Sequence, residues 1–113
     1  MNAHAFALLL LLGTPSLFAA ETDCAVTAEE WSRPRSAAMV VALPGVRECV
    51  QRWHADPRQQ LILVHAPGEE GALWASELRD WLVALGVPST QLVLRAVGTD
   101  AERVMLRVEA RVE

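Results

Sequence analysis

The sequence predicts a small α/β domain, a two-layer sandwich in which two helices lie on one face of a mixed sheet, in the order β-α-β-α-β-β. Short apolar runs that end at a proline–glycine pair indicate buried strands. Two longer segments repeat their apolar residues at helical spacing, and the C-terminal segment alternates apolar with polar residues. Because β-α-β crossovers are right-handed, both helices are expected on the same side of the sheet.

The chain of 113 residues divides into three segments. Residues 1–20 carry an apolar run too short to span a bilayer, followed by small residues, and predict a cleavable secretory signal peptide, with a retained anchor as the alternative. Residues 21–35 are polar and are expected to form an N-terminal segment tethered by a disulfide. Residues 36–113 are expected to form a single domain, and export predicts a periplasmic location.

Charge excludes some partners. The formal net charge at pH 7 is −4, and the first twenty residues contain no Asp, Glu, Lys or Arg. An acidic domain is poorly suited to nucleic acid or to an anionic membrane surface. We therefore expect neither as the main partner, and no stable membrane insertion after signal cleavage.

The two cysteines, Cys24 and Cys49, both lie outside the predicted signal peptide. An even number of cysteines in an exported chain favours a structural disulfide over reactive or metal-bound thiols. A redox pair would have its cysteines a few residues apart at a helix N-terminus. The residues ETD before Cys24 do not fit a lipoprotein signal, so we expect a Cys24–Cys49 bond.

The first half of the domain predicts one strand, one helix and a second strand. The run SAAMVVAL, residues 36–43, suits a buried strand ended by a proline–glycine pair. In residues 45–57 apolar side chains recur at helical spacing up to Pro57, which predicts a helix with Val46, Cys49, Val50 and Trp53 on one face. Residues 60–67, QLILVHAP, are almost continuously apolar and predict a central strand.

The second half predicts a helix followed by two strands. Residues 69–87 form an amphipathic pattern in which Glu69 and Glu70 suit the helix N-terminus and Gly86 follows its end. Residues 90–97 predict a third strand. Residues 102–112 alternate strictly and predict a last strand whose inward side chains are Val104, Leu106, Val108, Ala110 and Val112.

One part of the chain resembles a known family. The segment QLILVHAPGEEGALWASELRDWLVALGVPSTQLVLRAVG is similar to the middle of an OmpA-like C-terminal domain, a bacterial envelope module that often binds peptidoglycan, and the similarity covers about residues 39–98. With His65 on the family's turn histidine, Pro67 takes the place of the ligand-binding aspartate and Trp74 that of the ligand-binding arginine. Neither can form a charge-assisted bond with a diamino acid. The resemblance thus implies the fold of this family without its peptidoglycan site.

Other candidate chemistry is weak. His54 and His65 lack metal-ligand spacing, and adjacent acids such as Glu69 and Glu70 ordinarily stabilise a helix N-terminus. No nucleophile elbow surrounds a serine, and no glycine-rich phosphate loop is present. We therefore expect no catalytic residue, no cofactor and no metal site.

The tryptophans offer the remaining clue to a partner. Three of the four fall on helix stripes and suit the core, whereas Trp31 lies in the polar N-terminal segment. Trp31 either packs onto the domain or is an exposed anchor for a partner. Trp31, His65 and Arg79 are the candidate partner contacts.

Three classes of function follow. The first is a non-enzymatic periplasmic interaction or scaffold module, an accessory component of an envelope-spanning secretion, pilus or conjugation system that binds another envelope protein. The second is a divergent peptidoglycan-binding domain that uses His65 and Arg79. The third, a small periplasmic hydrolase or metal-dependent enzyme, has no residue pattern to support it.

Overall fold

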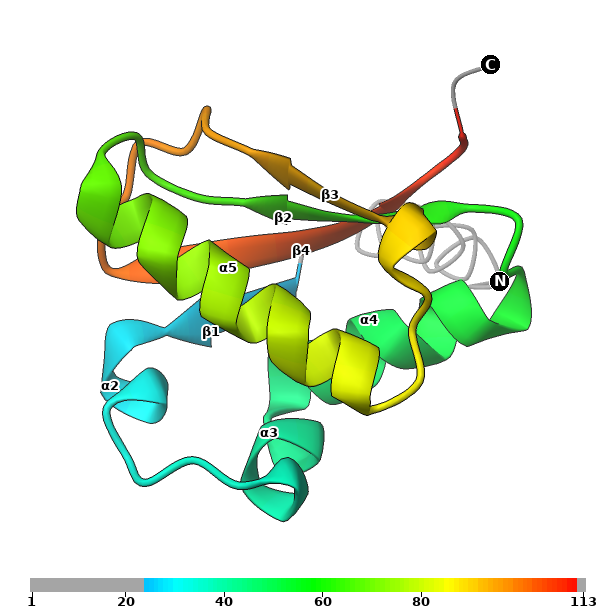
Figure 1. Ribbon diagram of the computed structural model, residues 1–113, viewed down its shortest axis with the longest axis horizontal. Coiled ribbons are helices and arrows are strands. Elements are labelled where there is room, and N and C mark those ends of the chain that lie inside the picture. The colour runs from blue at the N-terminus through cyan, green and yellow to red at the C-terminus, as the bar shows by residue number, and fades with distance from the viewer. Residues whose placement is uncertain (1–23, 112–113) are drawn as a thin grey trace, which may run out of the picture.

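The computed structural model describes residues 24–111 as a small α/β domain with a mixed sheet of four strands, which confirms the predicted fold class (Figure 1). The predicted signal peptide lies outside the described residues. The elements in chain order are β1 Cys24–Thr27, α2 Ala28–Trp31, α3 Ala37–Ala42, α4 Pro44–Ala55, β2 Gln60–Val64, α5 Glu69–Ala84, β3 Leu92–Arg95 and β4 Arg103–Glu109, with a 3-10 turn, Ser89–Gln91, before β3.

The strands lie in the order β1-β4-β2-β3. Strand β4 is antiparallel to both of its neighbours, and β2 is parallel to β3. Cys24, Leu106, Leu63 and Leu94 stand opposite one another across all four strands, and this row belongs to the face covered by the helices. The main core lies between that face and helices α3, α4 and α5.

The long elements confirm the periodicity arguments. Helix α4 buries Val46, Cys49 and Trp53 on one face, and α5 buries Leu78 and Leu82. Strand β2 lies between β4 and β3, and four of its five residues are buried. In β4 Val104 and Leu106 are buried at 1% and 0% exposure, whereas their neighbours are not. The strand ends at Glu109, so the prediction that Ala110 points inward is wrong: it lies exposed beyond the strand, and Val112 lies outside the described residues.

The prediction of a strand at residues 36–43 is wrong, because these residues form helix α3. Ser36 is its N-cap and accepts a hydrogen bond from the backbone N–H of Met39 at 3.1 Å. Val40 and Leu43, three residues apart, are buried, while Val41 is 47% exposed. A short apolar run is compatible with either structure, and here the serine N-cap stabilises the helix.

The first strand lies instead in the segment expected to be only a tether. Residues 24–27 form β1 at the edge of the sheet, and α2 follows directly. The sheet therefore begins twelve residues before the expected domain boundary at residue 36. A Cβ on Gly45 would lie 2.1 Å from the carbonyl oxygen of Ala25, so the absence of a side chain lets α4 pack directly on β1.

The expected disulfide between Cys24 and Cys49 is present and joins β1 to α4, with the two Cα atoms 6.1 Å apart. Both cysteines are buried, at 5% and 0% exposure. None of the helices in residues 24–111 is long and apolar enough to cross a membrane.

Candidate functional site

A pocket of about 490 Å³ opens at one end of the strands, where β1 and β2 end and β4 begins. Its walls come from α2 and the linker after it, the β2–α5 connection, the first half of α5 and the turn before β4. In open α/β sheets ligands bind outside the carboxyl ends of the parallel strands. The side chains that matter chemically are Trp31, Arg35, His65, Glu70, Leu73, Trp74, Glu77 and Glu102.

Two tryptophans form one wall of the pocket. The rings of Trp31 and Trp74 stack with centroids 6.4 Å apart and an interplanar angle of 27°. Trp31 is placed by a capping box, in which the Thr27 hydroxyl accepts from the N–H of Glu30 and the Glu30 carboxylate accepts from the N–H of Thr27. At 8% exposure Trp31 packs onto the domain, so it is not an exposed anchor.

The indole N–H of Trp74 is buried and has no acceptor among the described residues. Buried indole N–H groups usually find a partner, and an unmade bond of this kind costs about 1–3 kcal/mol. This nitrogen has almost no accessible surface, so a ligand in the open pocket reaches it only if the indole ring shifts.

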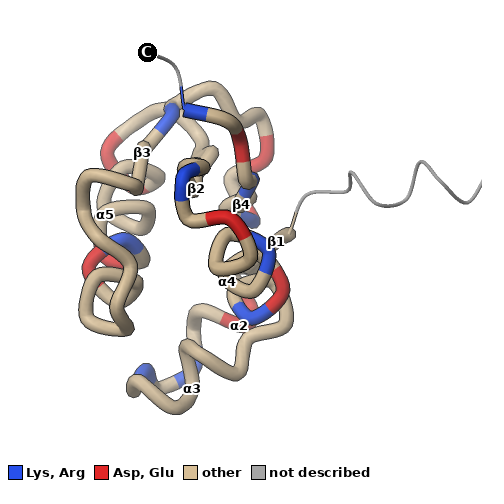
Figure 2. The backbone as a smooth tube through the Cα atoms, turned by 90° about the vertical axis from the view of Figure 1, so that its right-hand side faces the viewer, with Lys and Arg blue, Asp and Glu red and all other residues tan. Residues whose placement is uncertain are grey.

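Arg35 comes from the linker between α2 and α3, which carries basic residues (blue in Figure 2). Its guanidinium carbon lies 4.8 Å from the centroid of the Trp31 ring, a cation–π contact. Its Nε donates to Oε2 of Glu77 at 2.8 Å, and its Nη1 donates to the carbonyl oxygen of Trp31.

His65 is the one buried polar residue of the described chain, at 5% exposure. Its backbone N–H donates to Arg95 and its backbone carbonyl accepts from Gly98, at 3.0 and 2.9 Å. Its Nδ1 lies 2.9 Å from the carbonyl oxygen of Ala66, which can only accept, so the ring carries a proton on Nδ1. In the neutral ring Nε2 is an acceptor, and no partner for it is found within residues 24–111.

The rim of the pocket combines carboxylates with an apolar side chain. Glu70, in the first turn of α5, and Glu102, before β4, form no side-chain hydrogen bond or ion pair within the described part of the chain. Leu73 is 65% exposed between them in the pocket lining. This rim suits an apolar group that carries positive charge beside it.

The predicted contact residues are only partly brought together. Trp31 and His65 both line the pocket, as do Pro67 and Trp74, the two positions that the family resemblance singled out. Arg79 is not in the pocket lining, and its Nη2 instead donates to Asp80 at 3.3 Å. His65 and Arg79, the residues named for a divergent peptidoglycan-binding site, therefore do not share this pocket.

Sequence reasoning did not select Arg35 or Glu77. The two residues are 42 positions apart, and one lies in a linker without periodicity. The sequence feature that could have pointed to Arg35 is its spacing, because this arginine follows a tryptophan by four residues.

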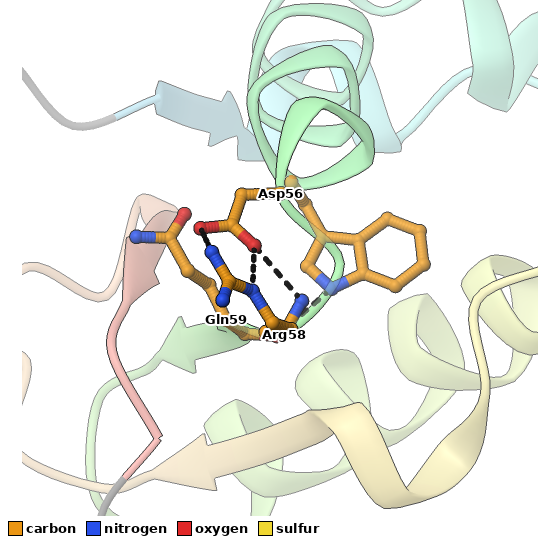
Figure 3. Close-up of polar contacts among 4 residues, drawn as sticks. Asp56, Arg58 and Gln59 are labelled. Atoms are coloured by element: carbon orange, nitrogen blue, oxygen red, sulfur yellow. Dashed lines mark hydrogen bonds and ion pairs between the residues drawn. The ribbon is translucent and has the colours of Figure 1, made fainter.

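A second polar cluster lies in the turn after α4 (Figure 3). Arg58 donates from its backbone N–H and from Nε to Oδ1 of Asp56, at 3.2 and 2.9 Å. Trp53 donates from Nε1 to the carbonyl oxygen of Gln59 at 3.0 Å, which closes the turn against the helix. The Arg58 side chain is exposed, and the contacts of this cluster stabilise the turn.

Within residues 24–111 no group of three or more His, Cys, Asp or Glu side chains could hold a metal ion. His54 lies exposed on α4, against the ring of Trp53, and His65 directly follows β2.

The sequence matches no known family model, and no curated protein or solved structure matches it. The OmpA-like resemblance stays a prediction. The role of the pocket is therefore argued from its own chemistry.

Proposed function

We propose that this chain is an exported, non-enzymatic binding module of the bacterial cell envelope, which holds a segment of another envelope protein in the pocket between α2 and α5. The observation that carries the proposal is the stacked Trp31–Trp74 wall, which lies beside Arg35 and His65 in the pocket lining. Tryptophan and arginine dominate the binding energy of protein interfaces, and polar groups that converge in an aromatic pocket fix the orientation of a ligand.

The rim favours a segment in which an apolar residue stands beside a basic one. Leu73 offers an exposed apolar contact, and the carboxylates of Glu70 and Glu102 are free to pair with a cation. Such a module fits an accessory role in an envelope-spanning secretion, pilus or conjugation system.

The residue types that line the pocket also favour a binding role over a catalytic one. Its residues include no Ser, Thr, Cys or Lys that could attack a substrate. The carboxylate of Glu77 is engaged by Arg35 at 2.8 Å, which makes it a poor general base.

Site-specific photo-crosslinking in the periplasm tests the proposal. A photoreactive amino acid at position 73 should capture one defined envelope protein, and the same amino acid at Val83, an exposed position on the same helix outside the pocket, should not. The Trp74→Leu substitution should abolish capture at position 73. Equal capture from both positions, or capture that survives Trp74→Leu, would contradict the proposal.

A divergent peptidoglycan binder is the second candidate, because the Arg35–Glu77 pair places a basic and an acidic group side by side in the pocket. Co-sedimentation with purified peptidoglycan separates the two functions. Retention that is lost in Arg35→Ala and in Glu77→Gln but kept in Arg79→Ala would replace the protein partner with the cell wall.

A further inference from the structure

We propose that the Trp31 ring, the Trp31 carbonyl oxygen and the Glu77 carboxylate form a binding site for a guanidinium group, which Arg35 occupies within the chain and which an arginine side chain of the partner takes over. This inference rests on the proposed function, since it names the group that the partner inserts into the pocket.

The three elements of the site match a guanidinium in both shape and charge. A guanidinium is planar, presents N–H donors around its edge and stacks on aromatic faces. In the structure the edge donates to Glu77 at 2.8 Å and to the carbonyl of Trp31, while the face lies over the Trp31 ring at 4.8 Å. The Trp74 ring stacks on that of Trp31, with centroids 6.4 Å apart, and extends the aromatic surface.

Arg35 is held weakly enough to be replaced. It belongs to a linker, residues 32–36, in which every residue is exposed, and its own side chain keeps 30% of its surface exposed. An ion pair between two partly exposed side chains is screened by water and adds little stability. A partner arginine that makes the same contacts restores what the displacement of Arg35 removes.

The charge of the pocket supports an additional cation. Three carboxylates line it, from Glu70, Glu77 and Glu102, against the guanidinium groups of Arg35 and Arg103. Arg103 is itself paired with Asp100 at 3.0 Å, so it neutralises little of the pocket. Glu70 and Glu77 are seven residues apart and lie on the same face of α5, which concentrates negative charge beside the site.

The alternative is that Arg35 is a structural clamp that ties the linker to α5. The two interpretations predict different results when the side chain is removed. A clamp leaves a less stable protein with no new affinity. A vacated guanidinium site gains affinity for arginine supplied from solution.

The test is a titration of the mature protein with N-acetyl-arginine amide, followed by tryptophan fluorescence and by calorimetry. In Arg35→Ala we expect saturable binding about tenfold or more tighter than in the wild type, because the competing internal occupant is gone. N-acetyl-citrulline amide, which has the same shape without the charge, should not saturate. Arg79→Ala, which removes an arginine outside the pocket, should behave as the wild type.

Adding Glu77→Gln to Arg35→Ala should abolish the binding of arginine. Arg35→Gln, which retains hydrogen-bonding groups without the charge, repeats the measurement if Arg35→Ala does not fold, and circular dichroism checks the fold of each variant. Equal binding of arginine and citrulline, no gain over the wild type, or binding that persists after Glu77→Gln would overturn the inference.

The two proposals can fail separately. If capture from position 73 holds but arginine does not bind, the pocket keeps its partner and the guanidinium site is wrong. If arginine binds but no envelope protein is captured, the guanidinium site stands without the proposed function.

Discussion

Asp56 and Arg58 show how a local contact changes the chemistry of a single residue. Hydrogen bonds from the Arg58 side chain, and then from its backbone N–H, hold the pKa of the Asp56 carboxyl below its ordinary value. The same pairing raises the pKa of Arg58. Because the Arg58 side chain is 89% exposed and that of Asp56 38% exposed, water screens the pair, and its effect is on protonation more than on stability.

We expect Arg58→Gln to raise the pKa of Asp56 toward its ordinary value, because the side-chain hydrogen bonds to the ionised form are lost. The stabilisation from the pair is present above the ordinary Asp pKa and is lost as the pH falls through the lowered pKa of Asp56. The carboxyl carbon shift of Asp56, followed by NMR against pH, measures the change. Arg47→Gln, elsewhere on α4, is the control, and an unchanged Asp56 titration in Arg58→Gln would refute the assigned cause.

Gly71 is a second position where one residue decides local geometry. A Cβ there would lie 2.1 Å from the carbonyl oxygen of Ala66, the same oxygen that accepts from Nδ1 of His65. The close approach of α5 to the end of β2 therefore depends on the missing side chain.

We expect Gly71→Ala to destabilise the protein by about 1–3 kcal/mol, because α5 must move away from the Ala66 carbonyl to make room. Ala72→Ser, one position along and exposed, should change the free energy of unfolding by less than about 0.5 kcal/mol. Urea unfolding measures both. Equal stabilities of the two variants would show that the connection can relax without cost.

At the level of elements, α5 has two distinct faces. Ala75, Leu78 and Leu82 are fully buried against the sheet, whereas Leu73 lies in the pocket lining at 65% exposure. The same helix thus supplies part of the core and part of the candidate site, which separates substitutions that affect stability from those that affect binding.

We expect Leu78→Ala to lower the free energy of unfolding by about 2–5 kcal/mol, because it removes fully buried methyl groups and leaves a cavity. Leu73→Ala is the matched control on the same helix, and it should leave stability nearly unchanged while weakening capture of the partner. Thermal and urea unfolding measure the pair of variants. Similar losses from both would show that Leu73 is packed more tightly than its exposure indicates.

At the level of the whole molecule, the disulfide fastens one edge of the sheet to a helix that covers it. It joins the edge strand β1 to α4, across a sequence separation of 25 residues. Strand β1 has only four residues and pairs with β4 alone, so the covalent link supports one of the two edge strands of the sheet.

Replacing both cysteines with serine should cost roughly 3 kcal/mol in unfolding free energy, because the unfolded chain regains the entropy of the closed loop. Reduction of the wild type should give the same loss, and this agreement is the control for the substitutions. The denatured, unreduced protein should contain no thiol that reacts with Ellman reagent. Two reactive thiols would contradict the bond.

Most of the fold and part of the candidate site could be predicted from the sequence. The helical stripes of α4 and α5 and the alternation in β4 are long enough to specify both structure and buried face. The run at residues 36–43 is too short to separate a strand from a helix, and β1 has only four residues in which to show alternation. Trp31 and His65 were selected from their residue types, whereas the Arg35–Glu77 pair depends on a tertiary contact that no local pattern encodes.

The position of β4 sets the order in which the protein can be completed. This last strand lies between β1 and β2, and it supplies every backbone pairing that β1 makes to the rest of the sheet. A nascent chain that has not yet been synthesised through Glu109 therefore has the β2–β3 pair but no strand partner for β1. Completion of the four-stranded sheet waits until synthesis has passed this strand, so the proposed export can begin before the sheet is closed.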